Sequence, residues 1–196
     1  MSEINRILIG GSAGSIENLQ YLLHDLEFTN LPAVVCAIHY SGKLPLLSTL
    51  NIKGSDFNVK YVERPLTLER RTIYVPHNNY HIILEENGHQ VRLFEGESFS
   101  YSKPSIDLLF LSCLGQEAKT TLAILLSGAN TDGQQGFLEL SRAGAMCAVV
   151  NPDISQFSTM PSAGLKAVPS AYIVNKKDTI NSLIERINDT QIKCTN

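Results

Sequence analysis

Residues 7–15 read ILIGGSAGS, an apolar run that breaks into small residues around Ser12. A run of this kind followed by a helical pattern predicts a strand-to-helix turn, with Ser12 at the edge of a sheet. Such a turn presents a hydroxyl beside free backbone N–H groups and the positive end of a helix. Two chemistries use that geometry: phosphate binding, and acyl transfer by a nucleophilic serine with an oxyanion hole.

Strand and helix signals alternate along the chain from this turn onward. Apolar residues recur at helical spacing from Ile16 to Leu26, and Ser15 is placed to cap that helix. Continuous apolar runs elsewhere predict strands buried on both faces, as in a parallel sheet. The strands are expected at residues 6–9, 33–38, 122–126, 145–150 and 172–174, with short candidates at 59–62 and 73–75. Helices are expected after Ser105, over 137–143, from Pro161 and after Thr179.

This alternation predicts an α/β fold: a doubly wound, mostly parallel sheet with helices on both faces. One segment departs from the pattern. Runs at 81–85 and 90–94 flank Asn87-Gly88, which predicts an added antiparallel β-hairpin whose two turn residues both have positive φ. The chain shows no internal repeat and no interdomain linker, so we expect a single domain over residues 1–196.

Bulk composition excludes several classes of protein. The net charge is −3 and no Lys/Arg tract stands out, which argues against nucleic acid or an anionic membrane as the main partner. The four cysteines form no C-x-x-C pair, and three of them lie in apolar stretches, as expected of buried thiols in a reducing compartment. No cationic leader and no run long enough to span a bilayer is present, so we expect a cytoplasmic protein.

Three side chains follow predicted strands in the loops where doubly wound sheets form their sites: Ser12, His39 and Asp132. Each has an ordinary alternative role, in a turn, in a carbonyl hydrogen bond or as a helix cap. Together they are complementary, because a serine nucleophile needs a base and the base benefits from an orienting carboxylate. We therefore predict that Ser12 attacks, His39 moves the proton and Asp132 orients His39.

The competing sites have weaker signals. The first turn lacks the full dinucleotide fingerprint and the Gly-Lys-Ser/Thr ending of a nucleotide loop, although its helix could hold an anion. The remaining histidines, His24, His77, His81 and His89, lie on an ordinary helix or around the hairpin, and no two histidines have a metal-helix spacing. We predict no metal and no cofactor.

Several segments, in order, resemble the catalytic domain of CheB, the chemotaxis protein-glutamate methylesterase family, from about Arg6 to Ile187. The most diagnostic are Pro-Ser-Ile-Asp-Leu-Leu-Phe at 104–110 and Ser-Gly-Ala-Asn-Thr-Asp-Gly at 127–133; the others are Ile-Gly-Gly-Ser at 9–12, Ile-His at 38–39, Ile-Tyr-Val-Pro at 73–76 with His81, and Met-Pro at 160–161. By position, the family's catalytic serine, histidine and aspartate fall on Ser12, His39 and Asp132.

The resemblance implies hydrolysis of γ-glutamyl methyl esters on the cytoplasmic helices of methyl-accepting chemoreceptors, in chemotaxis adaptation. Deamidation of selected glutamines is the related reaction. Backbone N–H groups at Ala13 and Ala129 are the candidate oxyanion donors.

The chain departs from the family pattern in three respects, one of which is the turn Gly128-Ala129-Asn130, where the family often has Gly-Met-Gly. Ala13 stands where the family usually has threonine, which suggests lower activity or a substitute role for Ser15. The chain also reaches its first strand by about Arg6, which leaves no room for the family's N-terminal receiver domain. We therefore expect a stand-alone domain, either constitutive or controlled by a separate regulatory protein. The alternatives are a non-catalytic or weakened binding module in a signalling assembly, and a nucleotide-binding protein.

Overall fold

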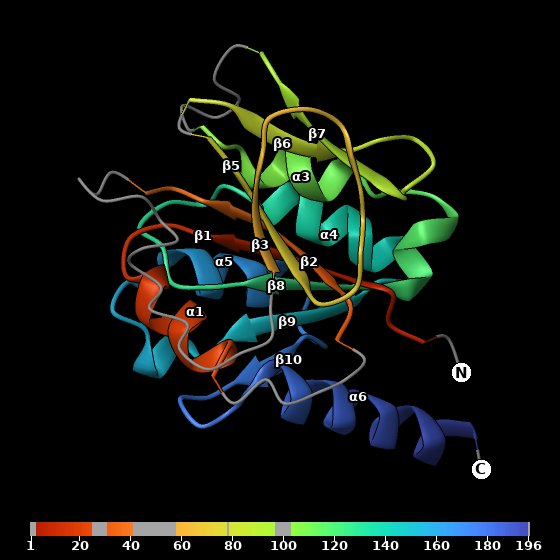
Figure 1. The fold of residues 1–196 in the computed structure, drawn as a ribbon. Helices are drawn as coiled ribbons and strands as arrows, with labels where there is room; N and C mark the ends of the chain where they lie inside the picture. Colours follow the sequence, from red (N-terminus) through yellow and green to blue (C-terminus); the bar gives the residue numbers. More distant parts are fainter. Residues whose placement is uncertain (1–2, 25–30, 41–57, 78, 97–102, 196) are drawn as a thin grey trace.

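A computed structural model describes residues 3–24, 31–40, 58–77, 79–96 and 103–195. The described strands form a central seven-stranded sheet in the order β10-β9-β8-β1-β2-β5-β3, and every pairing in it is parallel (Figure 1). Its strands are β1 (Arg6–Gly11), β2 (Ala33–Ile38), β3 (Asn58–Val62), β5 (Thr72–Pro76), β8 (Thr121–Leu125), β9 (Met146–Val150) and β10 (Tyr172–Val174).

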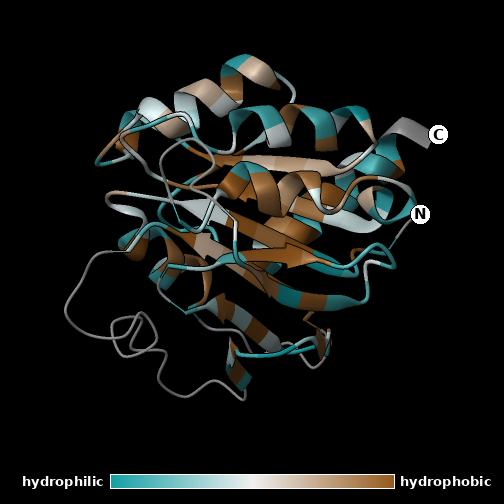
Figure 2. Ribbon diagram, turned by 90° about the horizontal axis from the view of Figure 1, so that it is seen from above, coloured by the Kyte–Doolittle hydropathy of each residue, from teal (hydrophilic) through white to brown (hydrophobic). Residues whose placement is uncertain are grey.

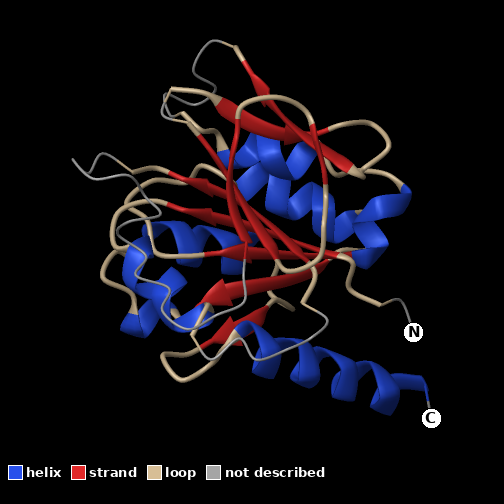
Figure 3. Ribbon diagram, viewed as in Figure 1, coloured by secondary structure: helices blue, strands red, loops and turns tan. Residues whose placement is uncertain are grey.

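Helices cover both faces of this sheet, as the alternating pattern predicted (Figure 3). They are α1 (Ser15–Leu22), α3 (Ile106–Leu111), α4 (Gln134–Arg142), α5 (Thr159–Ala167) and α6 (Ile180–Thr195), with short 3-10 helices η1 (Gln116–Thr120) and η2 (Pro152–Ile154). None of these described helices is long and apolar enough to cross a bilayer.

Successive residues of each strand supply two separate cores, because side chains alternate between the faces of a sheet. Ile7 and Ile9 of β1 pack with apolar residues of α1 and α6. Leu8, between them, packs on the opposite face with residues of α3, α4 and α5. Hydrophobic residues accordingly concentrate on the strands in the middle of the molecule (Figure 2). The doubly wound architecture is therefore confirmed.

The predicted hairpin is present, but it belongs to a second sheet. β6 (His81–Leu84) and β7 (Gln90–Phe94) pair in antiparallel fashion, and β4 (Leu66–Thr67) adds to the other edge of β7. The expected turn conformation is wrong, because Gly88 has φ 64° while Asn87 has no positive φ. The Asn87 side chain instead accepts a hydrogen bond from His89 N at 2.9 Å, in a five-residue loop closed by Glu85 N and Gln90 O.

Helix ends show where local sequence signals were right or wrong. The last helix begins directly after Thr179, as the sequence predicts. Thr179 caps it, since Thr179 Oγ1 accepts from Ser182 N at 3.3 Å and Ser182 Oγ accepts from Thr179 N at 2.9 Å. The expected cap at Ser15 is wrong: Gly14, with φ 76°, is the N-cap, and the buried Ser15 hydroxyl has no hydrogen-bond partner within the described residues. The helix expected after Ser105 is α3, which ends at Leu111, so the apolar Leu114 beyond it is 44% exposed.

Three cysteines are free and buried, as the sequence predicted: Cys36, Cys113 and Cys147. Burial raises the pKa of Cys36 and of Cys147 to about 12, so both remain protonated thiols at neutral pH. The fourth cysteine, Cys194, has a side chain outside the described part of the structure, as does the expected end of the first helix at Leu26.

Candidate active site

The three predicted site residues follow three neighbouring strands. Ser12 follows β1, His39 follows β2 and Asp132 lies in the turn after β8. β1 lies between β2 and β8 in the sheet, so their carboxyl ends meet at one edge. Backbone bonds hold the loops close to the strands: His39 N donates to Gly11 O and Ser12 N donates to Ser127 O, both at 2.9 Å.

The structure brings the three side chains together. His39 Nδ1 lies 3.2 Å from Ser12 Oγ, and His39 Nε2 lies 2.9 Å from Asp132 Oδ2. The His39 side chain is 13% exposed and that of Asp132 is 1% exposed, so the carboxylate is shielded while the imidazole reaches the edge of the site. In this arrangement neutral His39 carries its proton on Nε2, which donates to Asp132, and leaves the Nδ1 lone pair for the serine hydroxyl. In the chymotrypsin arrangement the opposite ring nitrogen faces the serine.

The Asp132 carboxylate is also held by the start of α3. Ile106 N donates to Oδ2 at 2.9 Å and Asp107 N donates to Oδ1 at 3.1 Å. Burial raises the pKa of the Asp132 carboxyl, but the hydrogen bonds from His39, Ile106 and Asp107 outweigh burial and hold that pKa below its usual range. Asp132 therefore stays ionised beside His39, as an orienting carboxylate must.

Helix α3 begins at this point because Ser105 caps it. Ser105 has an extended backbone and its Oγ accepts from Leu108 N at 3.2 Å. Ser105 N in turn donates to Nδ1 of the buried His81 at 2.9 Å, which ties α3 to the small sheet. The strand ends predict no role in the triad for His81 and none for Asp107. The pair Pro104-Ser105 before the apolar residues of α3 indicates the cap. No local sequence pattern indicates that the start of this helix contacts Asp132.

The candidate oxyanion donors lie on the turns after β1 and β8. The N–H groups of Ala13 and Ala129 make no hydrogen bond within the part of the chain that the structure describes. The Gly128 N–H, by contrast, donates to Phe157 O at 3.0 Å. The buried Ser127 hydroxyl donates to Ala13 O at 2.9 Å and fixes one turn against the other. These contacts are compatible with the predicted donors at Ala13 and Ala129.

The substitute role considered for Ser15 has no support in the geometry. Its hydroxyl is buried and has no hydrogen-bond partner in the described residues. A Cβ on Gly11 would lie 2.6 Å from the Ser15 Cβ, so the Ser15 side chain packs tightly against the end of β1. Ala13 therefore stands without a compensating hydroxyl from that residue.

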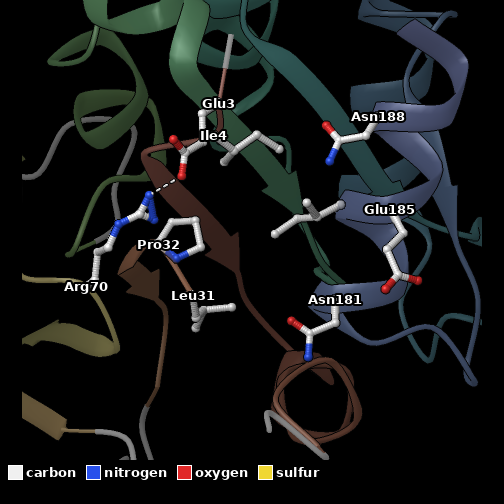
Figure 4. A pocket seen from close by; sticks show the side chains of 9 residues that line it. Glu3, Ile4, Leu31, Pro32, Arg70, Asn181, Glu185 and Asn188 are labelled. Carbon is white, nitrogen blue, oxygen red and sulfur yellow. Dashed lines mark hydrogen bonds and ion pairs between the residues drawn. The ribbon is translucent and has the colours of Figure 1, made fainter. Parts of the chain in front are cut away.

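A separate pocket lies at the opposite edge of the sheet. It has a volume of about 210 Å³ and is lined by Glu3, Ile4, Leu31, Pro32, Arg70, Asn181, Ile184, Glu185 and Asn188 (Figure 4). Leu31 and Pro32 precede β2, whereas His39 follows it, so the length of the strand separates this pocket from the site. Arg70 pairs with Glu3 at its rim, with 2.5 Å between Nη2 and Oε1. Among the described residues, no group of three His, Cys, Asp or Glu side chains is arranged to hold a metal ion.

Curated relatives of the chain come from several bacteria. A protein from Leptospira interrogans is 26% identical over 174 residues, which are 86% of this chain and 88% of that protein. A Hahella chejuensis protein named protein-glutamate methylesterase/protein-glutamine glutaminase 1 is 30% identical over 82% of the chain. The Escherichia coli protein named protein-glutamate methylesterase/protein-glutamine glutaminase is 23% identical over 97% of the chain. The match covers 45% of the Hahella protein and 55% of the Escherichia protein.

A solved structure and a family model agree with these relatives. The crystal structure of the Thermotoga maritima CheB methylesterase catalytic domain superimposes with a TM-score of 0.83 at 19% identity, over 92% of this chain and 97% of that one. This likeness shows a common fold. The family model described as CheB methylesterase matches residues 7–183. The chain therefore belongs to the CheB methylesterase family.

Proposed function

We propose that this chain is a serine hydrolase that cleaves glutamate γ-methyl esters on chemoreceptors, and that Ser12, His39 and Asp132 form its catalytic triad. The observation that carries the proposal is the position of His39, which lies within hydrogen-bond reach of both Ser12 Oγ and Asp132 Oδ2. Membership of the family supports the reaction type. The three residues come from three loops far apart in the sequence, and the fold brings them to one edge.

In the proposed mechanism, His39 Nδ1 takes the hydroxyl proton as Ser12 Oγ attacks the ester carbonyl carbon. The Ala13 and Ala129 N–H groups stabilise the oxyanion that forms. The bond to the methoxy oxygen breaks, the proton on Nδ1 passes to that oxygen, and methanol leaves an acyl ester on Ser12. Water, deprotonated by His39, then attacks the acyl ester. The bond to Ser12 Oγ breaks, the proton on His39 returns to Oγ, and the released glutamic acid ionises to the carboxylate. Asp132 stabilises the imidazolium in both halves of the cycle.

Deamidation of glutamine follows the same steps, with ammonia as the leaving group in place of methanol. The names of the Hahella and Escherichia relatives pair the two activities. We propose the cytoplasmic helices of methyl-accepting chemoreceptors as the substrate and the cytoplasm as the location. The reduced state of the buried cysteines is consistent with that compartment.

The test is methanol release from methylated receptor helices. The wild-type chain is expected to release methanol, and Ser12→Ala is expected to lose at least about 10³-fold in rate, since removal of a triad nucleophile costs that or more. Ser170→Ala is the matched control, because Ser170 is exposed and precedes β10 at the opposite edge of the sheet. Wild-type rates in Ser12→Ala would overturn the triad. A folded wild-type chain that binds the helices without releasing methanol would favour a binding module instead.

A further inference from the structure

Helices α3 and α4 begin side by side. Backbone N–H groups at the start of each helix donate hydrogen bonds to a carboxylate at the start of the other. Asp132, just before α4, accepts from the first N–H groups of α3 at Ile106 and Asp107. Asp107, in the first turn of α3, accepts from Gly136 N in the first turn of α4 at 2.7 Å. The two helix ends are therefore joined by hydrogen bonds that run in both directions.

Helix α4 needs this outside partner, because its own N-cap has no side chain. The N-cap is Gly133, with φ 90°, and the N–H groups of a first helical turn have no partner within the helix. The Asp107 carboxylate supplies the missing cap from a neighbouring element. The two helices are also in close contact, since a Cβ on Gly136 would lie 2.7 Å from Phe110 Cβ and 2.9 Å from Asp107 O.

The charge at Asp107 carries a cost in free energy. Burial raises the pKa of the Asp107 carboxyl above its usual range; the Gly136 N–H lowers that pKa and the Asp132 charge raises it. A neutral capping side chain avoids both the cost of burying a charge and the repulsion from Asp132. What Asp107 contributes is therefore the hydrogen bond that it accepts from Gly136 N, and the nearest reactive group that the joined helix ends hold in place is Asp132.

We infer that Asp107 is a positioning residue of the proposed triad, which fixes the start of α4 and so holds the Asp132 carboxylate in line with His39. The inference rests on the proposed function. Asp107 acts on Asp132 through its backbone N–H and through the turn that connects Asp132 to Gly136. Its removal loosens the alignment of His39 with Ser12. A misplacement of about 1 Å in such a site costs about 10²-fold in rate, so we expect a loss of about 10- to 100-fold in kcat.

The test compares Asp107→Ala with Asp107→Asn, whose amide oxygen can still accept from Gly136 N. The matched control is Ser112→Ala, at the other end of α3, which removes the acceptor of Leu84 N without touching Asp132. The readouts are kcat and KM for methanol release from methylated receptor helices, the thermal midpoint, and the downfield ¹H NMR signal of the His39 Nε2–H that donates to Asp132.

We expect Asp107→Ala to lower kcat at unchanged KM and to weaken or shift the His39 signal. Asp107→Asn should restore most of both, and Ser112→Ala should lower the thermal midpoint while it leaves both unchanged. Wild-type kcat and an unshifted His39 signal in Asp107→Ala overturn the inference, as does an equal loss in Ser112→Ala. If the alanine variant does not fold, Asp107→Leu, which is close to aspartate in shape and has no acceptor for Gly136 N, carries the same expectations. If the wild-type chain releases no methanol, the proposed function fails, and the NMR signals still decide the role of Asp107.

Discussion

Replacement of Asp132 by asparagine separates the charge of this side chain from its shape. Asp132 Oδ2 accepts from His39 Nε2 and Ile106 N, both at 2.9 Å, and Oδ1 accepts from Asp107 N at 3.1 Å. An asparagine has one acceptor oxygen and one NH₂ group in place of the two oxygens. If the amide oxygen takes the Oδ2 position, only the Asp107 N–H faces the NH₂ group and loses its acceptor. In the opposite orientation the His39 and Ile106 N–H groups both lose theirs. We therefore expect the oxygen to face His39.

This orientation determines how much stability and how much activity Asp132→Asn is expected to lose. One buried donor left unsatisfied lowers the free energy of unfolding by about 1–3 kcal/mol. The correct tautomer of His39 is kept, but the charge that stabilises the imidazolium is gone. We expect kcat of Asp132→Asn to fall by about 10²- to 10³-fold, equal to about 3–4 kcal/mol of transition-state stabilisation. Asp132→Ala loses the orientation as well, and should fall by about 10⁴-fold.

The assay is single-turnover methanol release from methylated receptor helices, with urea unfolding of each variant measured in parallel. Asp153→Asn is the matched control, because Asp153 is an exposed carboxylate on η2. The reasoning is refuted if Asp132→Asn matches the wild type in rate and stability. It is also refuted if the asparagine and alanine variants lose the same amount, because the alanine variant alone removes the contact with His39.

Three further predictions test the packing and charge around the site. Gly14→Ala should lower the free energy of unfolding more than Gly115→Ala in urea titrations. Both substitutions place a Cβ at positive φ, which costs about 1–2 kcal/mol of backbone strain. Only the Cβ at Gly14 (φ 76°) also meets other atoms, at 2.8–2.9 Å, whereas that at Gly115 (φ 102°) meets nothing within 4 Å. Glu117→Ala should cost about 2–4 kcal/mol in the same titrations and leave the rate of methanol release unchanged, because it removes the partner of the 3% exposed Arg6. Folding lowers the pKa of Asp132 below the value of about 3.9 expected in the unfolded chain. The Asp132 charge therefore stabilises the folded protein at pH values above about 3.9, and this contribution is lost as the pH falls through the lower pKa of the folded state. The contribution of the Asp132 charge to the difference in unfolding free energy between wild type and Asp132→Ala should therefore shrink below about pH 4; a difference that grows below that pH would contradict this.

The strands and the three site loops were predictable because their signals are local. A continuous apolar run of five or six residues indicates a buried parallel strand, and the carboxyl ends of neighbouring parallel strands meet at one edge. Ser12, His39 and Asp132 could therefore be selected before any contact was known. The details of the turns were less predictable. Ser15 and Gly14 both suit a helix start, and the positive φ of Gly14 put the cap one residue earlier than the serine suggested.

The partners of Asp132 could not be predicted, because they depend on how two helices pack. Asp107 N lies 25 residues from Asp132 along the chain, and the Asp107 carboxylate lies 29 residues from Gly136 N. No periodicity links positions at such separations. The hairpin shows the same limit: the runs around Asn87 predicted the pairing of β6 with β7, but not the addition of β4 at the edge of β7.

The central claim is that Ser12 is a nucleophile activated by His39. The most direct measurement is covalent labelling of the folded chain with a fluorophosphonate, read by mass spectrometry of the peptide that contains Ser12. We expect stoichiometric labelling at Ser12 in the wild type, slow labelling in Asp132→Ala and none in His39→Ala. An unlabelled wild-type chain, or equal labelling of Ser12 in His39→Ala, would contradict the claim.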